Sequence, residues 1–227
     1  AGSSERGLVL RWNGDSDSFG GDFCRDFGVV AELPARPASL AAYRGEDGEA
    51  RLAATTMVLT DGRDVGVWLS PPLGGDGLDA EDAGNWNLVW STFSYEPDLV
   101  VALYGYMGGA LQFFDGWLYW GTMHLANSPA ARIHSNCEFD VCFGTPADAE
   151  AERALREGVY RTGTVWRGRR LESAADREIE LLYGESELPA VSAPGTFENV
   201  PTGWEPRYGA SGFDNEANQY IWRMAVL

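Results

Sequence analysis

The chain of 227 residues has no lysine, only two histidines and only three cysteines. Its 17 basic residues are therefore all arginines, and they stand against 34 acidic residues, so the formal net charge is −17. A chain this acidic repels phosphate backbones, which argues against nucleic acid as a partner. No apolar run is long enough for a membrane-spanning helix, so we expect no membrane insertion.

The three cysteines, Cys24, Cys137 and Cys142, cannot all pair within one chain. Cys137 and Cys142 are close enough in sequence to form a disulfide across a tight turn. The alternative is three buried thiols that behave as small apolar residues. No Cys/His spacing resembles a zinc site, and neither a P-loop nor a G-x-G-x-x-G motif occurs. We therefore expect no metal and no cofactor.

Two stretches are rich in side-chain oxygens. Asn13, Asp15 and Asp17 place side-chain oxygens at every second position, as at the start of a calcium loop. However, Ser18 stands where the loop glycine is expected, and Cys24 stands where the final glutamate is expected. Residues 214–218 form the second stretch. Turns in which Asp and Asn side chains accept hydrogen bonds from neighbouring backbone amides explain both, so we prefer that interpretation to calcium binding.

What the sequence does contain favours an all-β fold. Hydrophobic residues make up 44% and charged residues 22%, which is typical of a globular protein. The strongest local signal is Asp115-Gly116, which separates the apolar runs 110–114 and 117–120. Both central residues of a type I′ turn need positive φ, and this dipeptide accommodates it, so a β-hairpin is predicted here.

Other segments follow the same pattern of short apolar runs between turn residues. Residues 99–103 are expected to lead into the central hairpin, and residues 190–206 to form a loop. One short surface helix is predicted near 146–157, with Thr145 as its N-cap and Gly158 after its end. Further strands are predicted at 7–12, 51–60, 65–70, 86–93, 159–166, 177–183 and 220–227, and one between 22 and 37.

The chain also contains a candidate internal repeat. Tyr104-Gly105 followed by 110–113 aligns with Tyr208-Gly209 followed by 224–227, roughly a hundred residues later. In the first copy the strand continues through Phe-Asp-Gly into a second strand. In the second copy the chain stops where that turn is expected. Chance similarity of two glycine-rich segments is the alternative explanation.

Four phrases carry a resemblance to a known family. They are S-Y-E-P-D (94–98), G-W-L-Y-W-G-T-M-H (116–124), L-L-Y-G-E-S-E-L-P (181–189) and Y-G-A-S-G-F-D-N-E-A-N-Q-Y-I-W-R-M (208–224). They resemble parts of bacterial β-propeller-like proteins of unknown function, in which Y-x-W-R-M-x-V precedes N/D-G-x-L-Y-x-G-T. The resemblance implies antiparallel blades in one domain over residues 1–227, and a C-terminally truncated, incomplete propeller. It implies no catalytic residue.

Candidate site residues follow from this architecture. If residues 117–122 line the channel of a propeller, Trp120 and His124 lie near its mouth, and Glu96 and Asp98 come from the turn one strand earlier. An indole face and carboxylates suit a sugar-binding or hydrolytic site. In the structural alternative, Asp98 caps backbone amides and His124 is a polar residue at a strand end.

The leading hypothesis is a non-enzymatic binding or interaction module for a carbohydrate or a protein. The first alternative is a glycan-acting hydrolase that uses Glu96, Asp98 and His124. The second is a structural surface domain. The sequence leaves enzymatic activity open and favours its absence, and the acidic, tryptophan-rich composition hints at an extracytoplasmic location.

Overall fold

A computed structural model of the chain describes residues 6–12, 27–57, 65–125, 129–130, 148–193 and 196–227. Its large sheet contains β3 (Arg36–Arg44), β4 (Ala50–Met57), β5 (Gly66–Leu69), β6 (Asn87–Ser91), β7 (Tyr106–Phe114), β8 (Trp117–His124), β9 (Val165–Arg169) and β10 (Glu178–Tyr183). Two separate hairpins pair β1 (Gly7–Trp12) with β2 (Phe27–Leu33), and β11 (Glu187–Ala193) with β12 (Thr196–Pro201). The α-helices in these ranges are α1 (Leu99–Tyr104) and α3 (Ala149–Gly158), and 3-10 turns lie at Ala80–Asp82, Thr92–Ser94 and Ser211–Phe213.

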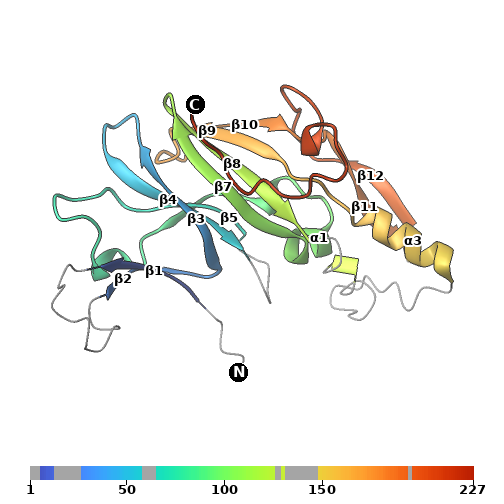
Figure 1. The fold of residues 1–227 in the computed structure, drawn as a ribbon, viewed down its shortest axis with the longest axis horizontal. Coiled ribbons are helices and arrows are strands. Elements are labelled where there is room, and N and C mark those ends of the chain that lie inside the picture. Colours follow the sequence, from blue (N-terminus) through green and yellow to red (C-terminus); the bar gives the residue numbers. More distant parts are fainter. Residues whose placement is uncertain (1–5, 13–26, 58–64, 126–128, 131–147, 194–195) are drawn as a thin grey trace.

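The large sheet runs in the order β10-β9-β8-β7-β4-β5-β6, with β3 paired to β4, and all of these pairs are antiparallel. The sheet curls across the middle of the molecule, and β11, β12 and α3 lie at one end (Figure 1). The all-β, partial propeller-like fold is thus confirmed. The strands of the expected blades are joined in one curled sheet.

The central hairpin forms as predicted. Asp115 has φ 48° and Gly116 has φ 77°, so both central residues occupy the left-handed region that a type I′ turn requires. The pairing runs from Phe114↔Trp117 at the turn to Tyr106↔His124 at the far end. With this register, β8 lies in the middle of the sheet, between β7 and β9.

Residues 99–103, which lead into the central hairpin, are helical, and this helix was not predicted from the sequence. Asp98 is the N-cap of α1, and its carboxylate accepts hydrogen bonds from the amides of Val100 and Val101. The two valines favour a strand by propensity, but capping and the burial of residues 100–103 outweigh that small preference.

The predicted helix near 146–157 is present as α3, with a different start. Asp148 is its N-cap and accepts hydrogen bonds from the amides of Glu150 and Ala151. Thr145 lies outside the described residues. Leu155 is buried, and Gly158 lies against the ring of Phe197 in β12, where a β-carbon would overlap the ring. The helix therefore packs on the β11–β12 hairpin.

The strand predicted between 22 and 37 is present as β2, and Arg36 and Pro37 already belong to β3. Two other expectations need correction. The predicted loop 190–206 contains part of the β11–β12 hairpin. The predicted last strand, residues 220–227, forms only one isolated bridge, between Tyr220 and Met123. The oxygen-rich stretch at 13–17 and all three cysteines lie outside the described residues, so the calcium and disulfide alternatives stay open.

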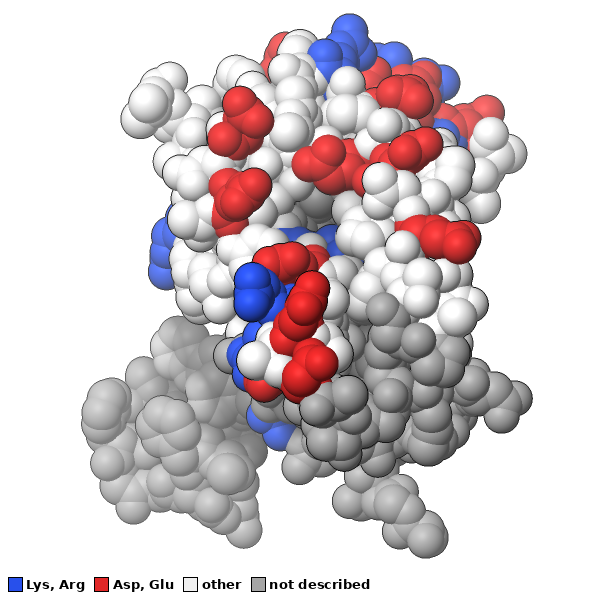
Figure 2. Space-filling model, turned by 90° about the vertical axis from the view of Figure 1, so that its right-hand side faces the viewer, with Lys and Arg blue, Asp and Glu red and all other residues white. Residues whose placement is uncertain are grey.

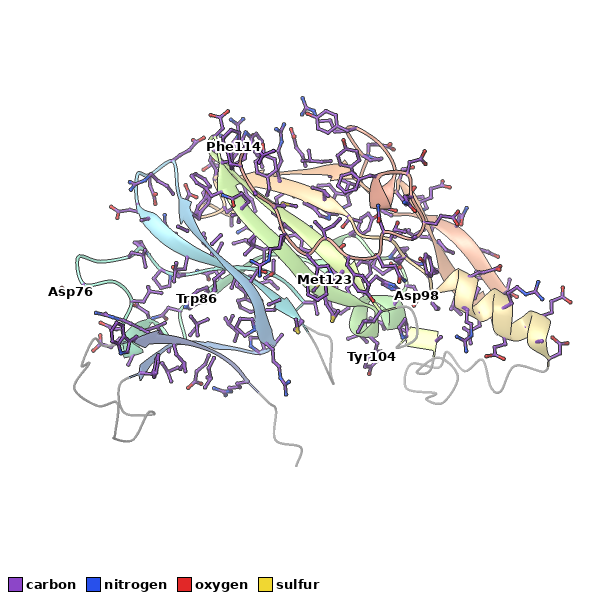
Figure 3. All side chains as sticks on the ribbon, in the orientation of Figure 1. Asp76, Trp86, Asp98, Tyr104, Phe114 and Met123 are labelled. Atoms are coloured by element: carbon purple, nitrogen blue, oxygen red, sulfur yellow. The ribbon has the colours of Figure 1, made fainter. Side chains whose placement is uncertain are left out.

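Aromatic residues fill the main core. Trp120 and Trp166 are fully buried, and their rings are nearly parallel with centroids 6.4 Å apart. Trp90 contacts both, at 5.7 and 5.0 Å. A smaller core joins the β1–β2 hairpin to the large sheet around Trp86, whose indole nitrogen donates to the Val30 carbonyl at 2.9 Å. Figure 3 shows Trp86 between these two parts.

The segment after the last 3-10 turn, residues 214–227, forms a tail that is held to the sheet where glycines let the chains approach. Ala110 donates its amide to the Ile221 carbonyl at 2.8 Å, and the Ile221 amide donates to the Thr122 carbonyl at 3.1 Å. A β-carbon on Gly121 would overlap the Ile221 side chain, and one on Gly163 would lie 2.9 Å from its Cγ1. Glycine at these positions makes room for Ile221.

Replacing Gly121 with alanine is expected to displace the tail. The added methyl group overlaps Ile221, and such overpacking costs about 1–3 kcal/mol. Limited proteolysis should then cleave the tail faster than in the unaltered protein, and chemical denaturation should give a lower free energy of unfolding. Gly84→Ala is the matched control, because nothing lies within 4 Å of its β-carbon position. Equal cleavage rates in both variants would contradict the assignment.

Candidate functional site

A hollow of about 300 Å³ opens beside the end of α3. Its walls come from residues 160–164 after α3, from Glu185, Glu187, Leu188 and Pro189 at the start of β11, and from Ser211 and Glu216. Figure 2 views this end of the molecule and shows acidic side chains around the hollowed part of its surface. The hollow is therefore a concave site at one end of the fold.

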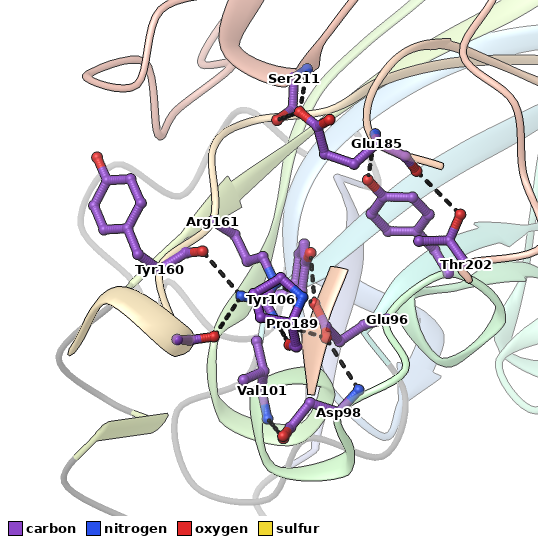
Figure 4. A network of polar contacts seen from close by, with 12 residues as sticks. Glu96, Asp98, Val101, Tyr106, Tyr160, Arg161, Glu185, Pro189, Thr202 and Ser211 are labelled. Atoms are coloured by element: carbon purple, nitrogen blue, oxygen red, sulfur yellow. Dashed lines mark hydrogen bonds and ion pairs between the residues drawn. The ribbon is translucent and has the colours of Figure 1, made fainter. Parts of the chain in front are cut away.

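A buried ion pair lies behind the hollow, and its arginine, Arg161, is one of the lining residues. The Arg161 guanidinium donates to both carboxylate oxygens of Glu96, from Nε to Oε2 at 2.8 Å and from Nη2 to Oε1 at 2.9 Å. Their side chains are 2% and 0% exposed. The remaining guanidinium hydrogens go to the carbonyls of Gly158, Tyr160 and Pro189 (Figure 4). The pair is thus hydrogen-bonded on every side of the guanidinium, as a buried charge requires.

Glu96 has two further donors. The Tyr106 hydroxyl donates to Oε2 at 3.0 Å, and the Asp98 amide donates to Oε1 at 3.0 Å. Burial of the Tyr106 ring and the charge of Glu96 raise the pKa of that phenol, so it remains a donor. Burial works to lower the pKa of Arg161, but Glu96 more than compensates and raises it.

The Asp98 carboxylate ties α1 to β11. Its Oδ1 caps α1, and its Oδ2 accepts the Val191 amide of β11 at 3.0 Å. The residue is 5% exposed. The structural alternative, in which Asp98 caps backbone amides, describes these contacts.

His124 lies behind this network with no exposed surface. Its ring packs edge-on against Tyr106, with centroids 5.3 Å apart. Within the described ranges, neither ring nitrogen has a hydrogen-bond partner. Burial, assisted by the positive charge of Arg161, lowers the pKa of His124 to about 3, so the imidazole is neutral.

Of the four sequence-predicted residues, Glu96, Asp98 and His124 come together around Tyr106 and Arg161. Trp120 instead contacts Trp90 and Trp166 in the core. All four side chains are buried. Glu96, Asp98 and His124 form the layer behind the hollow, and other residues form its surface. As direct ligand contacts they stay a prediction, and their burial favours a supporting role.

Sequence reasoning missed the residues that form the surface of the hollow. Tyr160 is half-buried, and its hydroxyl donates to the Glu216 carbonyl. Glu185 donates its amide to Tyr95 Oη at 2.9 Å and accepts from the Ser211 hydroxyl at 2.7 Å. Glu187 is exposed. Two signals were available: Tyr160-Arg161 directly after the helix, and the Gly-Glu-Ser-Glu sequence at 184–187.

The net charge of the hollow comes from the carboxyl groups at its rim. The Arg161 charge is matched by Glu96, whereas the rim adds the carboxyl groups of Glu185, Glu187 and Glu216. Hydroxyl groups of Thr162 and Ser211 lie between them. The site therefore offers hydrogen-bond acceptors, hydroxyls and a tyrosine ring, which suit a polyhydroxylated or cationic group better than an anion.

Metal ligation and membrane insertion both bear on the class of protein. In the described part of the chain, no group of three or more His, Cys, Asp or Glu side chains is arranged to hold a metal ion. None of the described helices has the length and apolar character needed to cross a membrane.

Comparisons with known proteins add no relative: no family model, no curated protein and no solved structure matches the chain.

Proposed function

We propose that this protein is a non-enzymatic binding module that holds a carbohydrate unit in the hollow beside α3. The observation that carries the proposal is the lining of that hollow, which combines the Tyr160 ring with carboxylates and hydroxyls around about 300 Å³. Carboxylates accept hydrogen bonds from sugar hydroxyls, and a tyrosine ring packs against the apolar face of a sugar. The volume is at the lower end of that of ligand pockets.

The layer behind the hollow supports binding without turnover. The oxygens of Glu96 accept four hydrogen bonds, and those of Asp98 accept three backbone amides. A general acid or a nucleophile needs a carboxyl oxygen that reaches the substrate. Both carboxylates instead support the walls, so the hydrolase alternative is the weaker one.

Calorimetric titration with a panel of neutral oligosaccharides tests this proposal. One of them should give saturable heat, and Tyr160→Ala and Glu187→Gln should each weaken its binding at least tenfold, which is about 1.4 kcal/mol. Glu187→Gln preserves shape and removes only the charge. Chromatography of the sugar after incubation should show no cleavage products.

The controls carry the same substitutions at exposed sites elsewhere. Tyr208→Ala removes a tyrosine ring that is 59% exposed, and Glu81→Gln neutralises an exposed carboxylate in a 3-10 turn. Both should bind as the unaltered protein does. If no sugar in the panel binds, or if Tyr160→Ala and Glu187→Gln bind normally, the carbohydrate proposal is wrong.

A further inference from the structure

A second concave surface, the tail groove, lies between β3 and the tail. It measures about 350 Å³ and is lined by Ala38, Ser39 and Leu40 of β3, by residues 108–111 of β7, by Met57 and Met123, and by residues 222–224 of the tail. Met123 lies on β8 in the middle of the molecule (Figure 3). The residues that line the tail groove and those that line the hollow are entirely different sets, so the groove is a separate surface.

One wall of the tail groove is a sheet edge. β3 is nine residues long and, among the described strands, pairs only with β4. Such an edge presents a row of unpaired amides and carbonyls, which natural proteins usually cover or interrupt. The central residue of this edge, Leu40, is 50% exposed. β3 therefore offers both a backbone ladder and an apolar side chain.

The opposite wall is apolar and carries one charge. Trp222 is 66% exposed, and Met224 lines the groove beside it. Beyond Ile221, the described tail forms no backbone hydrogen bond with the sheet. Among the described residues that line the tail groove, Arg223 is the only charged one. Its side chain is exposed, and it makes no ion pair with any described residue. In a chain of net charge −17, this groove is locally positive.

We propose that the tail groove binds an extended peptide segment of a partner protein, which adds a strand to the edge of β3 that no described strand pairs with. Pairing with β3 supplies the main-chain hydrogen bonds, and alternate apolar side chains enter the groove over Met57 and Met123. One carboxylate of the segment pairs with Arg223. The segment is otherwise uncharged, because a strongly acidic partner is repelled by a chain of net charge −17.

A second copy of this chain fits the groove less well. Symmetric antiparallel pairing of two β3 strands about Leu40 places Arg36 of one copy opposite Arg44 of the other, and like charges directly opposite destabilise a strand pair. Each copy also carries a net charge of −17. The partner is therefore a different chain.

Fluorescence anisotropy with synthetic peptides tests the proposal. The probe is a labelled nine-residue peptide, blocked at both ends, that alternates valine and threonine and carries one glutamate near an end. It should bind saturably, and amide hydrogen exchange of β3 should slow when it is bound. Arg223→Glu should weaken binding at least tenfold, and Trp222→Ala should also weaken it. Tyr208→Ala is the control for loss of an exposed ring.

Two altered peptides separate the contribution of main-chain pairing with β3 from that of the ion pair with Arg223. N-methylation of alternate amides keeps the side chains but blocks strand pairing, so this peptide should not bind. A peptide with lysine in place of glutamate should bind the unaltered protein at least tenfold more weakly and prefer Arg223→Glu. Binding that is insensitive to both changes would overturn the proposal. So would concentration-dependent dimerisation that Arg223→Glu abolishes, because a second copy then occupies the groove.

Discussion

Replacing Arg161 with methionine is expected to lower the free energy of unfolding by about 3–5 kcal/mol, because breaking a buried ion pair leaves an uncompensated charge. The substitution leaves the Glu96 carboxylate buried without its counter-charge. It also removes the donor from the carbonyls of Gly158, Tyr160 and Pro189. Urea denaturation followed by tryptophan fluorescence measures the change.

The matched control is Arg156→Met on the exposed face of α3. Arg156 pairs with Glu152, and both side chains are more than half exposed, so the loss there should be within about 1 kcal/mol. Adding Glu96→Gln to Arg161→Met should restore part of the lost stability, because the buried charge is then gone. Equal losses for Arg161→Met and Arg156→Met would show that the buried pair does not stabilise the fold.

Acidification is expected to destabilise the protein through His124. Its pKa is about 3 in the folded chain against an ordinary value of 6.5, so between these values the unfolded chain binds the additional proton. The stability from the neutral buried ring is present above pH 6.5 and is lost as the pH falls toward 3. The loss from this residue alone is about 2 kcal/mol between pH 7 and pH 5.

Comparison with a His124→Leu variant isolates this effect, because every other titrating group is common to both proteins. Among the described residues the imidazole has no hydrogen-bond partner, so an apolar side chain of similar size is expected to cost little at pH 7. Between pH 7 and pH 5 the variant should lose about 2 kcal/mol less than the unaltered protein. Parallel stability curves would mean that His124 is accessible to protons in the folded chain.

Local sequence signals predicted the elements in which local energies dominate. The Asp115-Gly116 turn formed as expected because its conformational requirement is confined to two residues. The helix near 146–157 was found from its capping and composition, although Asp148 and not Thr145 is the N-cap. The helix at 99–103 was not predicted, because its cap, Asp98, is itself held by Val191 from a distant strand.

The candidate site was only half predictable for the same reason. Glu96, Asp98 and His124 stand out in the sequence as chemically capable residues, and they do gather in space. Arg161, which neutralises Glu96, lies 65 residues away, and nothing in its local sequence indicates that it is buried. The residues that line the hollow come from segments far apart in the sequence, and their approach depends on how α3, β11 and the tail pack.

The sequence by itself determined the all-β class, the central hairpin, the helix near 146–157 and an acidity that argues against nucleic acid. These follow from composition, turn chemistry and periodicity, which act over a few residues. Only the tertiary structure decided that the predicted site residues are buried, that a tyrosine and three glutamates face the hollow, and that the tail leaves a groove beside β3. Long-range packing decides which polar groups are paired and buried and which remain available to a partner.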